Sequence, residues 1–382
     1  MNILFVVSNL SYPPAEGAHD QTLNLIINLI KNGYIVKLQG FIKSDSSFDL
    51  DRLKTDIPEL KLGKFENYST NYIFLAIKNI FCRRKISHEL FDIIHFEGFG
   101  VLTSVTNYRN SHSKLLMSLI DPWARRQKRR MLASKSTIHK LVFFVSWKIA
   151  YWLEMFFLKD YDAVHLVSAD DLSNISLDYP RATFIDIPVF FEVKDYKKYR
   201  RTNDVLSVLF WGDLNVPYLS EGFLFIIKTV IPFVSNVELK VLGRTSKSVY
   251  LKNHDIDDVD FEKIAFITWV DDVDVFISDF DIVILPDKNG TGLKNRTISS
   301  MMLGMTIVGS DFAFDGVAGE HGKDFFICNS QNEYIETLNL LQKNSETLAI
   351  VGKSANKTAE QNYSKDIVMK EWDELYRRLL NK

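Results

Sequence analysis

Cysteine is scarce in this chain. The 382 residues include two, Cys82 and Cys328, which lie far apart in the sequence. Two cysteines so placed fit no metal-ligand spacing and form no disulfide framework, which agrees with a reducing compartment. Net charge is also small, −2 at pH 7. That balance argues against a general nucleic-acid binder, because such proteins need a basic surface.

A long uninterrupted apolar run is missing as well. The opening run Ile3–Val7 is short and has no basic residues before it, so it does not match a signal peptide. We therefore expect a cytosolic protein. The longest apolar stretch, Leu141–Leu158, contains Lys148 and Glu154, and charges near the centre of a spanning helix are unfavourable. We interpret this stretch as a buried or interfacial helix, not a transmembrane one.

The composition is otherwise that of a globular protein, with 46% hydrophobic and 25% charged residues. The chain is too long for one ordinary core, so we expect two domains. The charged stretch 191–203 is the candidate linker, which places the domains at 1–195 and 204–361. A last helix within 362–382 is expected to pack back on the first domain.

The chain opens with a predicted βαβ unit. A strand at 3–7, a loop at 8–18 and a helix at 19–32 are followed by Gly33 and a strand at 35–38. The loop lies at the carboxyl end of the first strand, where open α/β sheets bind ligands. Gly17 allows a tight turn there, and His19 either faces a substrate or is a solvated residue of the first helical turn.

Further strands are predicted at 91–97, 114–120, 163–168 and 184–188, whereas 45–85 shows no clear period. His95 and Glu97 come at or near the carboxyl end of the first of these, followed by glycines. Asp121 follows the second and opens onto the same crevice, although a cap or turn role is equally compatible with that position.

Basic and aromatic side chains alternate over 123–152, beginning with Trp123 and the run 125–130. This combination suits an anionic membrane surface, where each basic residue contributes about 1 kcal/mol. RNA binding needs similar ingredients. A solvated helix with its apolar side against the core is a third interpretation.

The second half restarts with a strand at 205–212 that ends in Gly212, and a strand at 237–242 that precedes Gly243 and Arg244. Strands follow at 265–270, 282–285 and 306–309. Between the last two, the turn Gly290-Thr291-Gly292 opens a helix at 293–303 with Lys294 in its first turn. Such a turn suits a phosphate or pyrophosphate. Plain left-handed turn geometry with a solvated lysine explains it equally well.

Four stretches together resemble the motifs of one family. They are ILFVVSNLSYPPAEGAHDQTLNLIINLIKNGYIVKL, FDIIHFEGF, YDAVHLVSADD and LPDKNGTGLKNRTISSMMLGMTIVGS. The chain resembles GT4-type glycosyltransferases of the GTGLKN subgroup along nearly its whole length. The resemblance implies an α/β, GT-B fold: two Rossmann-like, doubly wound domains facing a central cleft. It implies transfer of a sugar from a nucleotide sugar to an acceptor hydroxyl with retention, without a required metal or other cofactor.

The resemblance also implies site residues. The donor pyrophosphate is expected near Gly290, Thr291, Gly292, Leu293 and Lys294, with Gly212, Gly243, Arg244 and Ser299 as further donor-side residues. The first domain is expected to hold the acceptor near Gly17, His19 and Glu97. Asp121, His95 and Lys294 are the catalytic candidates.

Two positions depart from the family pattern. Ser299 stands where the subgroup keeps a glutamate for the donor ribose, and a serine supplies no carboxylate. Asp121 follows a strand after which many relatives have histidine. The acidic pairs Asp170-Asp171 and Asp271-Asp272 are interpreted as caps and turns, not metal sites.

The leading hypothesis is a cytoplasmic glycosyltransferase, peripheral on the inner face of the membrane through 123–152. It would build a surface polysaccharide, such as O-antigen lipopolysaccharide or capsule, on a lipid-linked or glycan acceptor, with no nucleic-acid partner. A degenerate family member that serves as a binding or scaffold module is the alternative, and a nucleotide-sugar epimerase is a third. A nicotinamide dehydrogenase is disfavoured because no G-x-G-x-x-G follows the first strand.

Overall fold

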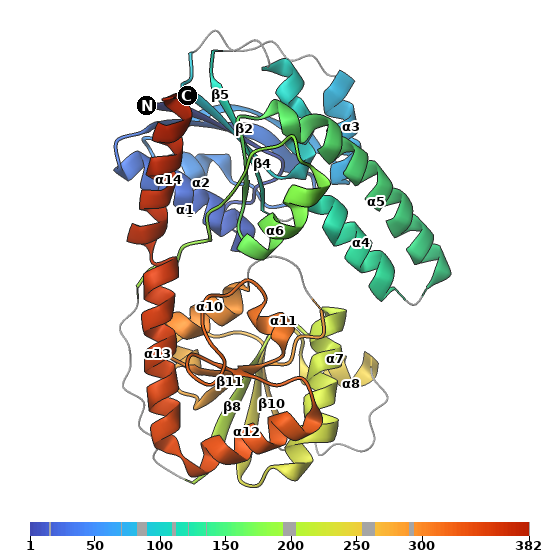
Figure 1. Ribbon diagram of the computed structural model, residues 1–382, viewed down its shortest axis with the longest axis vertical. Coiled ribbons are helices and arrows are strands. Elements are labelled where there is room, and N and C mark those ends of the chain that lie inside the picture. The colour runs from blue at the N-terminus through green and yellow to red at the C-terminus, as the bar shows by residue number, and fades with distance from the viewer. Residues whose placement is uncertain are drawn as a thin grey trace. The chain divides into compact units, whose positions relative to one another are not determined.

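A computed structural model describes residues 1–14, 17–69, 71–81, 90–108, 112–120, 122–134, 136–193, 204–253, 264–289 and 294–381. The chain forms two compact units. Unit 1 comprises Met1–Phe190 and Val368–Lys382, and unit 2 comprises Phe191–Ile367. Each unit is a parallel sheet covered by helices on both faces (Figure 1).

The sheet of unit 1 has seven strands in the order β3-β2-β1-β4-β5-β6-β7. All neighbouring strands run parallel. The strands are β1 (Asn2–Val7), β2 (Ile35–Lys43), β3 (Lys61–Tyr68), β4 (Ile93–Glu97), β5 (Lys114–Ile120), β6 (Ala163–Leu166) and β7 (Phe184–Asp186). The apolar runs of the inner strands β1, β4, β5 and β6 are buried on both faces, as a parallel sheet between two helical layers requires.

Successive residues of each strand alternate between the two layers. Leu4 and Val6 of β1 belong to one apolar cluster, and Ile3, Phe5 and Val7 to the other. Helices α3 (Tyr72–Phe81), α4 (Trp123–Ala133), α5 (Thr137–Phe157) and α6 (Ala169–Asp178) and the 3-10 helix Phe99–Asn107 lie on the first side. Helices α1 (Gly17–Lys31), α2 (Leu50–Asp56) and α14 (Lys365–Leu380) lie on the second.

The last helix completes the core of unit 1. Trp372, Leu375, Tyr376 and Leu379 of α14 are buried in the same apolar cluster as strand β1. Figure 1 shows α14 (red) lying beside the first elements of the chain (blue). Residues from the two ends of the sequence therefore share one core.

The sheet of unit 2 has six parallel strands in the order β10-β9-β8-β11-β12-β13. The strands are β8 (Leu206–Trp211), β9 (Val237–Leu242), β10 (Ile264–Ile267), β11 (Ile282–Leu285), β12 (Thr306–Gly309) and β13 (Phe326–Ile327). The helices are α7 (Pro217–Phe225), α8 (Lys247–Asn253), α9 (Val273–Ile277), α10 (Asn295–Met302), α11 (Asp311–Phe314), α12 (Gln331–Lys343) and α13 (Ser345–Tyr363). This strand order is that of the dinucleotide-binding fold.

Helix boundaries follow local chemistry. Gly33 has a φ of 84° just after α1, as expected of a glycine that ends a helix. Ser330 and Glu333 form a capping box, so α12 begins at Gln331. The helical segment that follows β8 is divided into α7 and a π-helix, Ile226–Val230.

Candidate functional site

A pocket of about 160 Å³ lies at the carboxyl ends of β1 and β4 in unit 1. The strand order reverses there, because β1 pairs with β2 on one side and β4 with β5 on the other. Ligands of open α/β sheets bind at such a reversal. Polar groups reach the pocket from α1, from β4 and, through Arg126, from α4. Unit 1 thus has a candidate site beside its first βαβ unit.

His19 lines this pocket from the first turn of α1, which begins at Gly17. Its Nδ1 lies 2.8 Å from Ser11 Oγ, and its Nε2 lies 3.4 Å from Asn9 Nδ2. The residue is 7% exposed, so the solvated alternative is wrong. The imidazole is instead fixed against the loop that follows β1, and its acceptor-side role stays a prediction.

Glu97 is the acidic group of the pocket. It is the last residue of β4 and accepts a hydrogen bond from Thr22 Oγ1 of α1. Burial raises the pKa of its carboxyl to about 7, and the hydrogen bond from Thr22 opposes that rise. A carboxyl that titrates near neutrality can bind a hydroxyl and exchange a proton with it. Its geometry is therefore compatible with the predicted acceptor side.

Ile120 ends β5 at the wall of the pocket. Its φ is 65°, a left-handed conformation that a β-branched residue rarely adopts. Such strain is found where a functional site requires it. The next residue, Asp121, one of the predicted catalytic groups, lies outside the described residues.

His95 does not reach this pocket. It has no exposed surface, and its ring centroid lies 4.5 Å from that of Phe5 and 5.4 Å from that of Trp372. A group covered on all sides cannot touch a substrate, so the prediction of a catalytic His95 is wrong. Its side chain points to the face that α14 covers, while its neighbours Ile94 and Phe96 point to the other.

His95 belongs to a buried chain of hydrogen bonds. Its Nδ1 lies 2.9 Å from Tyr376 Oη, and its Nε2 lies 2.7 Å from Ser118 Oγ. Ser118 Oγ lies 2.8 Å from His165 Nδ1, and His165 Nε2 lies 2.8 Å from the carbonyl of Ile187. That carbonyl only accepts, so each group in turn donates toward it, beginning with the Tyr376 hydroxyl. Burial lowers the pKa of both histidines, that of His165 to about 4, so both are neutral.

In unit 2, two predicted glycines bring strand ends together. The amide of Gly212, just after β8, donates to the carbonyl of Leu242 in β9 over 2.9 Å. A Cβ on Gly243 would lie 2.2 Å from the carbonyl oxygen of Gly212. Only glycine fits there, which explains the residue type. The strand order of unit 2 reverses beside this point, between β8 and β11.

Arg244 follows Gly243 and is largely exposed. Its Nε lies 2.9 Å from Asp213 Oδ2, and the hydroxyl of Thr245 donates to Asp213 Oδ1 over 2.9 Å. These donors, with the amide of Asn215, hold the pKa of Asp213 below its usual range although burial opposes them. The predicted donor-side arginine is thus oriented by an aspartate next to Gly212.

Sequence reasoning missed the pair Arg296 and Asp287. Arg296, in the first turn of α10, places Nη2 2.7 Å from Asp287 Oδ2 and donates through Nη1 to the carbonyl of Trp211. Asp287 follows β11 and is 2% exposed, and its Oδ1 has no hydrogen-bond partner. The pair joins the ends of β8 and β11 to the start of α10. The available signal was an arginine two residues after Lys294 and an aspartate directly after Pro286.

The predicted phosphate loop is partly described. Gly290, Thr291, Gly292 and Leu293 lie outside the described residues. Lys294 immediately precedes α10 as its N-cap residue, and its carbonyl accepts from Ile298 over 3.1 Å. Ser299 is half-buried on α10. Lys294 and the first amides of α10 therefore lie at the same end of the helix, where an anion is favoured.

The acidic pairs have local roles where they are described. Asp272 caps α9, accepting from the amides of Asp274 and Val275, as predicted. The side chains of Asp170 and Asp171 lie outside the described residues. Within the described part of the chain, no three histidine, cysteine or acidic side chains gather as metal ligands.

Comparison with known proteins places unit 2 in a family. Residues 206–344 match the family model described as glycosyl transferases group 1. The chain carries a group 1 glycosyltransferase domain. This domain contains β8 to β12, the glycine contact and the Arg296–Asp287 pair. By sequence alone, no curated protein matches the chain.

Solved structures share the fold of this chain along its length. Sucrose-phosphate synthase from Thermosynechococcus elongatus matches with a TM-score of 0.71 and 11% identity over 100% of both chains. Anabaena Alr3699/HepE in complex with UDP-glucose matches with a TM-score of 0.67 and 12% identity, over 99% of this chain and 100% of that one. WaaG is described as a glycosyltransferase involved in lipopolysaccharide biosynthesis. It matches with a TM-score of 0.67 and 12% identity, over 97% of this chain and 98% of that one.

These findings confirm the predicted GT4-type family and the GT-B fold of two Rossmann-like units. The family is one of retaining enzymes that use nucleotide sugars. The roles of the individual site residues, and the central cleft, stay predictions.

Proposed function

We propose that the chain transfers a sugar from a nucleoside-diphosphate donor bound by unit 2 to a lipid-linked acceptor bound by unit 1. It would act on the cytoplasmic face of a membrane, in the assembly of a bacterial surface polysaccharide such as O-antigen or capsule. The likeness to HepE with UDP-glucose supports a uridine donor, and the likeness to WaaG supports a surface glycan.

The membrane part of this proposal depends on the helical hairpin of α4 and α5. The two helices pack on each other and extend from the edge of unit 1 (Figure 1). One side of α5 packs on the core through Ala150, Leu153 and Glu154. Apolar residues of α5 that remain exposed are Ile138, Leu141, Val142, Phe144, Val145, Trp152 and Phe156. A soluble monomer rarely exposes so many large apolar side chains together.

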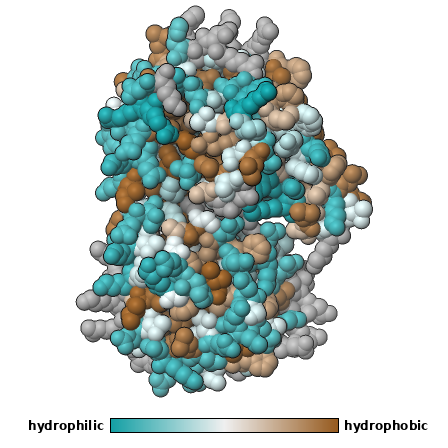
Figure 2. Space-filling view, in the orientation of Figure 1, coloured by the Kyte–Doolittle hydropathy of each residue, from teal (hydrophilic) through white to brown (hydrophobic). Residues whose placement is uncertain are grey.

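The surface of the hairpin mixes apolar and hydrophilic groups, as Figure 2 shows at its outer edge. By length and composition alone, Thr137–Asp160 could cross a membrane. Only 22% of its most apolar 18-residue stretch is buried inside the protein. The side of α5 opposite its exposed apolar residues packs on the rest of unit 1. This arrangement favours a helix that lies in the membrane interface. This agrees with the interfacial interpretation of the sequence.

Basic side chains accompany the aromatic ones. Lys148 Nζ lies 4.2 Å from the centroid of the Trp147 ring, and Lys128 Nζ lies 5.3 Å from it. Tryptophan and lysine together suit the depth of lipid headgroups, where an indole is half solvated and anions are near. The hairpin therefore fits an anionic lipid surface better than a protein core.

Donor binding is assigned to unit 2. Gly212 and Gly243 pack closely on each other beside the strand reversal, and Lys294 with the start of α10 would hold the diphosphate. Charge stabilisation on the departing diphosphate is the main chemical assistance such a transfer needs. In this proposal protein groups supply it and no metal ion is required.

The test uses a labelled nucleotide sugar and a bacterial membrane lipid extract. A thermal-shift panel of UDP, GDP, CMP and ADP first identifies the donor, because a ligand at about 100 times its Kd stabilises the fold by roughly 2.7 kcal/mol. Label that moves into the lipid-extractable fraction supports the proposal. Donor binding without any lipid-extractable product, over a range of lipid extracts, would overturn the lipid-linked acceptor.

A further inference from the structure

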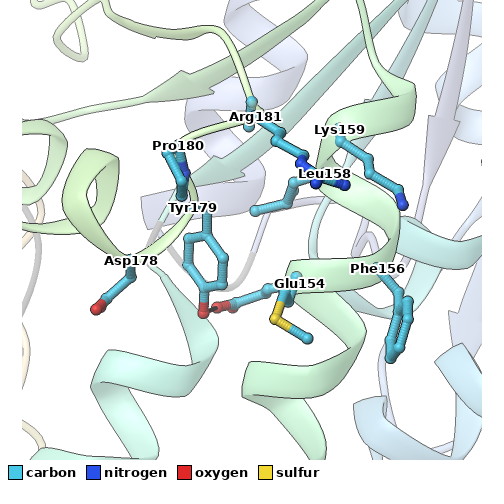
Figure 3. A pocket seen from close by; sticks show the side chains of 10 residues that line it. Glu154, Phe156, Leu158, Lys159, Asp178, Tyr179, Pro180 and Arg181 are labelled. Atoms are coloured by element: carbon cyan, nitrogen blue, oxygen red, sulfur yellow. Dashed lines mark hydrogen bonds between the residues drawn. The ribbon is translucent and has the colours of Figure 1, made fainter.

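A second pocket of unit 1 is separate from the one at the strand reversal. It has a volume of about 330 Å³ and lies between the end of α5 and the loop that joins α6 to β7 (Figure 3). That volume reaches the range of small-molecule sites, roughly 300–1,000 Å³. None of its lining residues lines the pocket that contains Glu97.

The lining of the second pocket is mostly apolar. Its apolar members are Met155, Phe156, Leu158, Tyr179, Pro180 and Ala182. The acidic group, Glu154, is fully buried and already bonded: Tyr179 Oη donates to Oε2 over 2.6 Å, and the amide of Ala124 donates to Oε1 over 3.1 Å. An aliphatic chain in this pocket would therefore contact mainly hydrocarbon groups of the wall.

Two cations stand on one side of the pocket. Lys159 and Arg181 both line it and both are exposed. Figure 3 shows the Arg181 side chain extending toward Lys159, with Asp178 on the far side of the Tyr179 ring. The charge is thus divided, basic at one side and acidic at the other. An anionic head beside Arg181 and Lys159, with an apolar tail directed into the pocket, matches this division.

The pocket also continues the exposed apolar face of α5. Phe156 lines the pocket and stacks on Trp152, with ring centroids 5.7 Å apart, and each is 52% exposed. Tryptophan side chains such as that of Trp152 are enriched at membrane interfaces, so the rim of the pocket suits such a surface. A lipid leaving that interface would meet the pocket first.

We propose that this pocket binds one alkyl phosphate: the hydrocarbon chain fills the cavity and the phosphate pairs with Arg181 and Lys159. The ligand chemistry has two sources, a membrane phospholipid and the isoprenoid phosphate of a lipid-linked acceptor. The inference rests on the proposed membrane function for its source of lipid, but the pocket and its ligand class do not depend on sugar transfer.

Calorimetric titration of the whole chain with soluble alkyl phosphates tests the site. Affinity should rise about fourfold for each methylene from octyl to dodecyl phosphate, because each buried CH₂ contributes about 0.8 kcal/mol. Inorganic phosphate alone should bind too weakly to detect. Tighter binding of dodecyl than of farnesyl phosphate would indicate membrane lipid as the source, and the reverse would indicate the acceptor. No heat from either chain type would overturn the site.

Variants locate the ligand. Arg181→Gln should weaken dodecyl phosphate binding about fivefold, the effect of one cation near an anionic lipid. Ala182→Phe should abolish it by filling the cavity. Lys140→Gln, which removes a lysine elsewhere on α5, should leave it unchanged. Equal binding by all three variants would overturn the assignment. If Ala182→Phe does not fold, Arg181→Gln still tests the site, because Arg181 is exposed.

The donor panel separates this inference from the proposed function. Arg181→Gln should keep the thermal shift with the donor nucleotide, since the residue lies in unit 1. Alkyl phosphate binding without lipid-extractable product would retain the pocket and reject the lipid acceptor. If a variant that binds no alkyl phosphate formed lipid product at the wild-type rate, the lipid acceptor would be retained and the pocket rejected.

Discussion

Arg296 Nη2 lies 2.7 Å from Asp287 Oδ2, and this ion pair connects the start of α10 to the end of β11. The second nitrogen of the same guanidinium donates to the carbonyl of Trp211 at the end of β8. Both strands that flank the reversal in unit 2 are thus joined to the helix whose N-terminus is assigned to the diphosphate. We consider Arg296 a positioning residue.

Arg296→Met should destabilise unit 2 by about 3–5 kcal/mol, because it leaves the buried Asp287 without its partner. Replacing both residues, as Arg296→Met with Asp287→Leu, should recover much of that loss. A double-mutant cycle on thermal unfolding, with the donor nucleotide Kd measured beside it, checks both. If the double variant were as unstable as the sum of the two single ones, the pair would not be coupled.

Lys294→Ala should lower the rate of transfer roughly 100-fold to 1,000-fold, the loss typical of one preorganised group that stabilises developing charge. Its thermal unfolding should remain near that of the wild type, since Lys294 is half-buried at a helix start. Lys343→Ala, at the exposed end of α12, is the matched control. An unchanged kcat in Lys294→Ala would remove the lysine from the site.

The pH dependence of stability follows from Glu154. Burial raises the pKa of this carboxyl from 4.5 to about 7, so the folded chain keeps a proton that the unfolded chain releases. The free energy of unfolding should therefore fall as pH rises from 4.5 to about 7, by about 3 kcal/mol from this group. Glu154→Gln should reduce that slope and leave the part contributed by Glu97, whose pKa burial also raises to about 7, as chemical denaturation at several pH values would show. Glu336→Gln, exposed on α12, should leave it unchanged.

Ser118→Ala should destabilise unit 1 by about 1–3 kcal/mol without reaching the pocket of Glu97. The serine is the central link between His95 and His165, so its removal leaves a buried donor and a buried acceptor without partners. Differential calorimetry measures the loss. Donor binding by unit 2 serves as the internal control and should not change.

Leu141→Glu with Val145→Glu places two charges one helical turn apart on the exposed face of α5. Binding to anionic vesicles should be lost, whereas thermal stability should change by less than about 0.5 kcal/mol per site, as is usual at a surface. Leu340→Glu, at a similarly exposed leucine of α12 in unit 2, is the control for co-sedimentation. Vesicle binding that survived the double substitution would exclude this face.

Most strands could be predicted from the sequence because a parallel sheet buried on both faces needs continuous apolar runs, such as Ile282–Leu285. Helix α13 was missed because small and polar residues, Gly352, Ala355, Asn356 and Ala359, make the middle of its buried face. A Cβ on Gly352 would lie 2.1 Å from the carbonyl of Gly304, and Asn356 Nδ2 donates to the carbonyl of Met302 over 2.7 Å. Such close packing interrupts the stripe of large apolar residues between Val351 and Tyr363, so the helical period is hard to detect.

The site was predictable only in part. The glycines and Lys294 stand out because their residue types suit a phosphate, and Glu97 because it ends a strand. His95 lies in the same strand as Glu97, but the tyrosine that binds it comes 281 residues later in α14, and no local pattern shows which face of β4 that helix covers. The Arg296–Asp287 pair spans a loop between two elements, so its contact depends on tertiary structure.

The origin of α14 has a consequence for synthesis on the ribosome. Domains generally fold as they emerge, beginning with the N-terminal one. Unit 1 is translated first, yet Trp372, Tyr376 and Leu379 of its core emerge last, after the whole of unit 2. Part of the apolar core of unit 1 must therefore stay uncovered until α14 has been synthesised, whereas unit 2 can complete its fold earlier. The first half of the chain is then the part most in need of a chaperone.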